Sequence, residues 1–85
     1  MTRLWPEGET VEIWGEEETP SGFIWQGTNH PIAESGIHWR VHTRWWEPGQ
    51  AIWREYVKVA TDTGLLCLLY RDMPMGGWFL ARIYD

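Results

Sequence analysis

The stretch IHWRVHTR, residues 37–44, decides the fold class. Its residues alternate between two chemical types, as expected of a β-strand, whose successive side chains point to opposite faces. The first set is apolar or neutral and is expected to face a core: Ile37, Trp39, Val41 and Thr43. The second set is polar or basic and is expected to face solvent or a partner: His38, Arg40, His42 and Arg44. This period of two predicts a strand over residues 37–44.

Outward from this strand, short segments rich in Val, Ile, Thr, Trp and Tyr lie between turn residues, a pattern typical of all-β domains. The further strands are expected at residues 10–14, 23–26, 31–33, 53–61, 65–71 and 78–84. Residues 27–29 are expected to turn a hairpin, and the last three strands to form an antiparallel meander. The sequence therefore predicts a small antiparallel, strongly twisted sheet or partly open barrel of about six strands.

Two features of the C-terminal half refine this prediction. The run 65–70 is apolar on both faces, which places it as the central strand of the meander. Residues 48–56 also fit a helical period, but the β-branched residues that follow favour a strand, and both alternatives stay open. The side chains expected to be largely buried are Trp39, Val41, Val57, Val59, Leu66, Leu68, Leu80 and Ile83.

The chain of 85 residues has the length of one small domain, residues 1–85. It contains eight Trp, which fill a small core efficiently, and one cysteine, Cys67, which excludes an internal disulfide. There is no apolar run long enough to span a membrane and no secretory signal. We therefore expect a cytoplasmic protein that does not insert into membranes.

The formal net charge of −5 is unevenly distributed. Residues 1–34 carry most of the excess acid, including Glu16, Glu17 and Glu18, whereas residues 35–85 are close to neutral. Binding driven by phosphate contacts needs clustered positive charge, so we expect the molecule as a whole to bind nucleic acid poorly in a non-specific manner. A local basic face is still compatible with this composition.

No constellation of residues points to catalysis, to a metal or to a cofactor. His38 and His42 share a strand face but lie ~13 Å apart at ~3.3 Å per residue, too far for one metal ion. Cys67 lies within the most apolar strand, where burial raises a thiol pKa and lowers its reactivity. We therefore expect no catalytic residues, no metal site, no cofactor and no enzyme activity.

One candidate binding surface remains. Trp45 and Trp46 are adjacent in a strand and so point to opposite faces. Continuing the alternation places Trp46 on the polar face, where an aromatic ring beside cations would suit an acidic peptide or a nucleotide strand. The candidate binding residues are Trp46, His38, Arg40, His42 and Arg44. The alternative is a solvated face paired with the acidic first strand.

The second half of the chain also resembles a known family. The residues that carry the resemblance are Trp39-Arg40-Val41, Trp45-Trp46, Arg54-Glu55-Tyr56, Thr61 to Leu65, Leu69 to Asp72, and Trp78 to Asp85, preceded by Phe23, Trp25, Gly27, Pro31 and Ile32. In this order they resemble the small C-terminal domain of unknown function of ImuB-type proteins, inactive Y-family DNA polymerase homologues of the bacterial mutasome. The resemblance covers residues 20–85 and leaves the acidic residues 1–19 outside.

The resemblance implies a bacterial context of DNA damage tolerance and transfers no catalytic residue. We expect a non-catalytic interaction module that contacts a protein, such as a polymerase or a recombination or repair protein, through its aromatic and basic strand face. The alternative is a small barrel that binds single-stranded nucleic acid. An enzyme that uses the histidines is the remote alternative. The domain could also associate with a second copy of itself as a homodimer.

Overall fold

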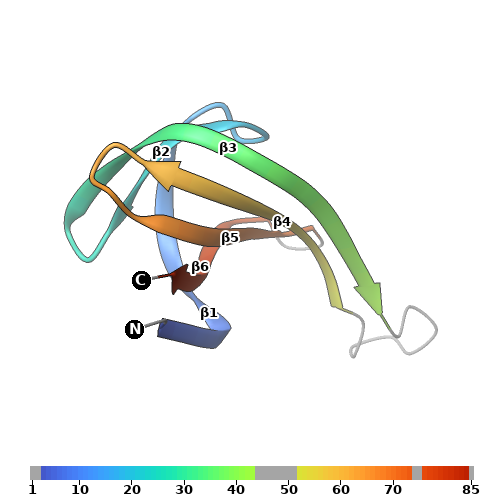
Figure 1. The fold of residues 1–85 in the computed structure, drawn as a ribbon. Helices are drawn as coiled ribbons and strands as arrows, with labels where there is room; N and C mark the ends of the chain where they lie inside the picture. The colour runs from blue at the N-terminus through green and yellow to red at the C-terminus, as the bar shows by residue number, and fades with distance from the viewer. Residues whose placement is uncertain (1–2, 44–51, 74–75, 85) are drawn as a thin grey trace.

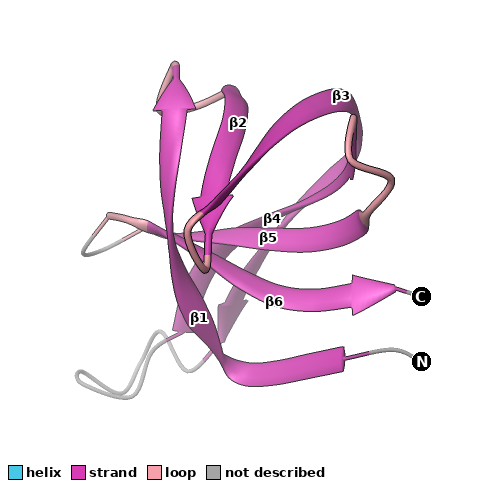
Figure 2. Ribbon diagram, turned by 90° about the vertical axis from the view of Figure 1, so that its left-hand side faces the viewer, coloured by secondary structure: helices cyan, strands magenta, loops and turns pink. Residues whose placement is uncertain are grey.

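The computed structural model describes residues 3–43, 52–73 and 76–84, and they form six antiparallel strands (Figure 1). The strands are β1 (Arg3–Gly15), β2 (Pro20–Trp25), β3 (Thr28–Thr43), β4 (Ile52–Thr61), β5 (Leu66–Asp72) and β6 (Trp78–Tyr84). Each strand pairs with the next, and β1 also pairs with β6, which closes the sheet into a barrel (Figure 2). The predicted all-β fold is thus confirmed, including the C-terminal meander. The described residues contain no helix long and apolar enough to cross a membrane.

Two hairpins connect the first three strands. The β2–β3 turn consists of Gln26 and Gly27, both with positive φ (51° and 77°), which is the backbone of a two-residue hairpin turn. The hairpin was predicted correctly, but its turn begins one residue earlier than the predicted residues 27–29 and ends at Gly27, since Thr28 already pairs with Trp25. In the β1–β2 loop, the carbonyl of Glu17 accepts a hydrogen bond of 3.0 Å from Trp78 Nε1. This bond joins the acidic loop to the start of β6.

The longest strand, β3, takes part in two different pairings. Thr28–Pro31 pairs with β2, and Ile32–Thr43 pairs with β4. Between these partners the register with β4 shifts twice, once between Ile32 and Glu34 and once between Ser35 and His38. Bulges of this kind bend a strand and increase its twist, so residues 31–33 and 37–44, expected as separate strands, belong to one bent strand. For the ambiguous segment 48–56, Ile52 onward is strand, and residues 48–51 lie outside the described residues.

The core fills the barrel and takes its buried hydrophobic side chains from β1, β2, β4, β5 and β6, while the partly buried Ile32 of β3 packs against it. Its buried hydrophobic side chains are Val11, Phe23, Trp25, Val57, Val59, Cys67, Leu69, Trp78, Leu80 and Ile83. Of the residues predicted to be buried, Val57, Val59, Leu68, Leu80 and Ile83 are confirmed. Cys67 is fully buried, as predicted, and desolvation raises its thiol pKa to about 11.

Two core predictions were wrong. Trp39 is 40% exposed and Leu66 is 39% exposed, while Val41 is only half-buried. The register explains Trp39: its neighbour His38 lies opposite the buried Val57, so Trp39 points to the outer face of the barrel. Leu66 is exposed at the start of β5, on the outer face of the barrel, whereas Leu68 and Tyr70 on the same face are buried. The run that is apolar on both faces is therefore buried on both faces beyond Leu66.

Candidate binding faces of the β3–β4 arm

The candidate site residues lie where β3 and β4 extend to the right in Figure 1, away from β1 and β2. We call this part, residues 37–43 of β3 and 52–56 of β4, the β3–β4 arm. Directly opposed residues of an antiparallel pair point to the same face. His38 is opposite Val57, whose side chain lies in the core. The histidines and arginine predicted to form one face therefore continue the inner face of the barrel, contrary to the expectation that Trp39 would point inward.

The inner face of the arm carries paired charges and a stacked ring. Arg40 Nε lies 3.0 Å from Glu55 Oε2, and Arg71 Nη2 lies 3.8 Å from Glu55 Oε1. His42 stacks on Trp53 with ring centroids 5.1 Å apart and planes 17° from parallel. One carboxylate thus contacts two guanidinium groups, which leaves this cluster with an excess of positive charge.

Three of the five predicted binding residues, His38, Arg40 and His42, share this inner face. The other two, Arg44 and Trp46, lie outside the described residues, as does Trp45. Arg40 pairs with Glu55 of the neighbouring strand, so its partner is not the acidic first strand considered as the alternative. Of the candidate binding surface predicted from the sequence, the structure therefore describes only His38, Arg40 and His42.

The outer face carries a row of aromatic rings across four strands. Trp39 stacks on Tyr56 at 5.4 Å between ring centroids, Tyr56 tilts against Tyr70 at 5.4 Å, and Tyr70 stacks on Phe79 at 5.0 Å. The row is buried at Tyr70, where Gly8 of β1 approaches the phenol, and it becomes exposed toward Trp39. Its open end therefore lies on the arm.

Arg54 lies on the aromatic row. Its Cζ is 4.4 Å from the centroid of the Tyr70 ring, and its Nη1 donates a hydrogen bond of 3.4 Å to Tyr56 Oη. Burial acts to lower the pKa of Arg54, but the hydrogen bond to Tyr56 and the nearby Tyr70 and Asp72 outweigh it, so the pKa is raised. The guanidinium stays charged beside the rings, where cation–π attraction holds it.

Sequence reasoning missed Trp53, Arg54 and Tyr56 as members of these faces. Residues 53–57 alternate between the two faces, and that signal was available. The information that was lacking is the register between β3 and β4, which brings Trp39 beside Tyr56 and His42 beside Trp53. Register depends on contacts between distant residues and could not be derived from a single strand.

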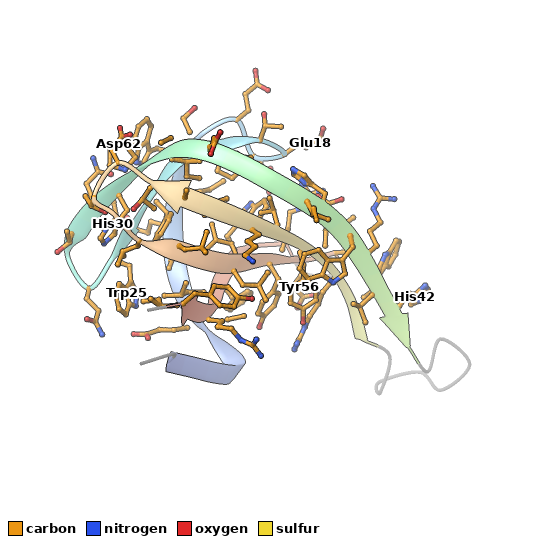
Figure 3. The ribbon with its side chains drawn as sticks, viewed as in Figure 1. Glu18, Trp25, His30, His42, Tyr56 and Asp62 are labelled. Atoms are coloured by element: carbon orange, nitrogen blue, oxygen red, sulfur yellow. The ribbon has the colours of Figure 1, made fainter. Side chains whose placement is uncertain are left out.

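The third histidine lies at the other end of the molecule. Figure 3 shows His30 and Trp25 at the end of the sheet opposite His42. His30 is buried, its Nδ1 lies 2.7 Å from Thr63 Oγ1, and its ring is 5.2 Å from that of Phe23. Among the residues that the structure describes, no three His, Cys, Asp or Glu side chains are grouped as metal ligands would be.

Comparison with known proteins places these faces in a family. The model of a domain of unknown function, DUF6504, matches residues 7–85. The chain belongs to the DUF6504 family. A search of curated proteins and a search of solved structures each gave no significant match. The arm, the aromatic row and the acidic β1–β2 loop are therefore all parts of the DUF6504 domain.

Proposed function

We propose that this DUF6504 domain is a non-catalytic protein-interaction module whose β3–β4 arm binds an extended segment of a partner protein. The observation that carries the proposal is the open edge of β3. Beyond Pro31, β3 pairs with β4 on one side, and no described strand pairs with its other side. An edge of this kind offers free backbone N–H and C=O groups to an added strand.

The side chains along this edge supply apolar contact area. Ile37 is 73% exposed, and Trp39 and Trp53 are also exposed large hydrophobic residues. Exposed Trp side chains are enriched among the residues that contribute most to protein–protein binding. Main-chain pairing with the β3 edge would give affinity, and Ile37 and Trp39 would select the side chains of the added strand.

The arm favours a partner segment that contains acidic residues, because Arg40 is largely exposed and the Arg40–Glu55–Arg71 cluster has excess positive charge. The resemblance to the C-terminal domain of ImuB-type proteins supplies the candidates: a polymerase or a recombination or repair protein of a bacterial mutasome. A cytoplasmic setting accords with the one buried, free thiol of Cys67.

A matched pair of isoleucine variants tests the proposal. Ile37→Lys places a charge on the β3 edge, where lysine opposes strand addition. Ile24→Lys makes the same change on β2, at a side chain that is 39% exposed. We expect Ile37→Lys to weaken binding to purified mutasome proteins at least tenfold by calorimetry, and Ile24→Lys to leave it unchanged.

The competing outcomes are distinct. Equal effects of the two variants would overturn the assignment of the β3 edge. Analytical ultracentrifugation tests whether the domain forms a homodimer. If it does, and if Ile37→Lys dissociates the dimer, the edge pairs with a second copy rather than with a different protein. Circular dichroism of both variants controls for unfolding.

A further inference from the structure

We propose a second binding site, for single-stranded nucleic acid, on the outer face of β4, β5 and β6. It is built on Lys58, Arg82 and Tyr84, and it is separate from the arm and does not rest on the function proposed for the arm. Strand register brings these residues together. Lys58 and Arg82 both lie opposite Leu68, and Tyr84 lies opposite Leu66. All therefore point to the outer face of the barrel.

Two cations share one aromatic ring in this cluster. Lys58 Nζ lies 4.7 Å from the centroid of the Tyr84 ring, and Arg82 Cζ lies 5.5 Å from it. Within the described part of the chain, neither cation has a carboxylate at salt-bridge distance. The Nε of Arg82 is buried and has no hydrogen-bond partner. An anion between the two side chains would pair with both cations, and phosphate suits a lysine and an arginine together.

A pocket opens beside Lys58. It has a volume of about 280 Å³ and is lined by Glu34, Ser35, Gly36, Lys58, Val59, Ala60 and Leu66. The pocket lies at the bulge of β3, where Gly36 passes close to β4: a Cβ at Gly36 would lie 3.3 Å from the Lys58 carbonyl. This volume is slightly below the ~300–1,000 Å³ of pockets for drug-sized ligands, so it suits a single planar group.

The combination of a phosphate site and a small pocket favours a nucleotide strand over an acidic peptide. A nucleotide supplies both an anion for Lys58 and Arg82 and a flat ring for the half-exposed apolar surface of Leu66 and Tyr84. Aspartate and glutamate side chains carry no ring. A single strand can present an unpaired base to the pocket, whereas a duplex keeps its bases stacked inside.

The net negative charge of the chain does not oppose binding at this place. The acidic β1–β2 loop contacts Trp78 at the start of β6, and Arg82 lies four residues further along the strand, a distance of ~13 Å. Charges that far apart are largely screened, since the Debye length is ~8 Å at physiological salt. Among the described residues that line the pocket, Glu34 is the acidic side chain, and it would repel a phosphate.

Fluorescence anisotropy of the domain with a labelled oligothymidylate tests this site. With two phosphate contacts and a slope of ~0.7 each, raising NaCl from about 50 to about 200 mM should lower the affinity about sevenfold. In the variants Lys58→Gln and Arg82→Gln, which each keep one phosphate contact, the same increase in NaCl should lower the affinity only about threefold. Glu34→Gln should strengthen binding, which tests the site even where a cation variant fails to fold. Arg40→Gln, on the other face, is the control and should leave binding unchanged.

Several results would overturn the proposal. They are an affinity that does not depend on salt, equal losses in Arg40→Gln and Lys58→Gln, or equally effective competition by polyglutamate. Preference for duplex over single-stranded DNA would also contradict the role of the pocket. Because Arg40 lies on the inner face of the arm and does not line the pocket, oligothymidylate binding that survives Arg40→Gln separates the two surfaces.

Discussion

Trp39 and Tyr56 stack across the β3–β4 pair with ring centroids 5.4 Å apart and planes only 9° from parallel. The pair begins an aromatic row that continues through Tyr70 to Phe79, so three of its members lie on strands that also form the barrel core. Trp39 is thus attached to a rigid support although 40% of its surface is exposed. A supported, exposed ring of this kind can contact a partner with little loss of side-chain entropy.

The first prediction compares two tryptophans. Trp39→Ala should lower the free energy of unfolding by about 1 kcal/mol, the range of an aromatic pair, because its ring is only partly buried. Trp78→Ala should cost ~3–5 kcal/mol, since Trp78 is 3% exposed within the core. Urea denaturation followed by circular dichroism measures both. A loss above ~3 kcal/mol for Trp39→Ala would mean that this ring is part of a core after all.

The fold could be predicted from the sequence because alternation and turn residues are local signals. The strands at residues 53–61 and 78–84 were correctly placed, and the β5 run was correctly made the centre of the meander. The faces of β3 could not be predicted in the same way. Whether Trp39 or His38 points inward depends on the opposite residue, and the pairing of His38 with Val57 is a tertiary fact.

The candidate sites were predictable only in part, for the same reason. The basic and histidine residues of β3 were recognised from their alternation, but their partners Glu55 and Trp53 come from β4. The cluster of Lys58, Arg82 and Tyr84 brings together two strands that lie on either side of β5. Its members are far apart in sequence, and no local motif marks them.

A second prediction uses neighbouring leucines of β5. Leu69 is fully buried, so Leu69→Ala should destabilise the domain by ~2–5 kcal/mol through loss of burial and creation of a cavity. Leu66 is 39% exposed on the outer face, so Leu66→Ala should cost less than about 1 kcal/mol. Thermal unfolding of both variants gives the comparison. Equal losses would contradict the inner and outer assignment of this strand.

A third prediction concerns pH. Burial raises the pKa of Cys67 from 9.0 to about 11, so the folded state favours the neutral thiol. This contribution to stability is fully present below pH 9.0 and is lost as the pH rises toward 11. The stability of the native protein should therefore fall more steeply than that of Cys67→Ala over this range. Denaturant titrations at several pH values measure the difference, and parallel curves would rule out a buried thiol.

A thiol reagent at pH 8 should label the folded protein far more slowly than the unfolded chain.

The last prediction compares two glycines with nearly the same backbone. Gly8 and Gly27 have φ of 76° and 77°, a conformation that costs other residues ~1–2 kcal/mol. A Cβ at Gly27 would meet nothing within 4 Å, so Gly27→Ala should show that backbone cost alone. A Cβ at Gly8 would collide with the Tyr70 hydroxyl and lie 2.8 Å from Phe79 Cβ, inside the buried end of the aromatic row.

Gly8→Ala should therefore lose clearly more stability than Gly27→Ala, since the added methyl group must displace Tyr70 from its place between Tyr56 and Phe79. The same displacement should change the near-ultraviolet circular dichroism of the row, whereas Gly27→Ala should leave that spectrum unaltered. Urea denaturation and the two spectra test both expectations. Equal stability losses with unchanged spectra would mean that β1 does not approach the row, and that the aromatic surface available to a partner extends beyond Trp39 and Tyr56 onto Tyr70.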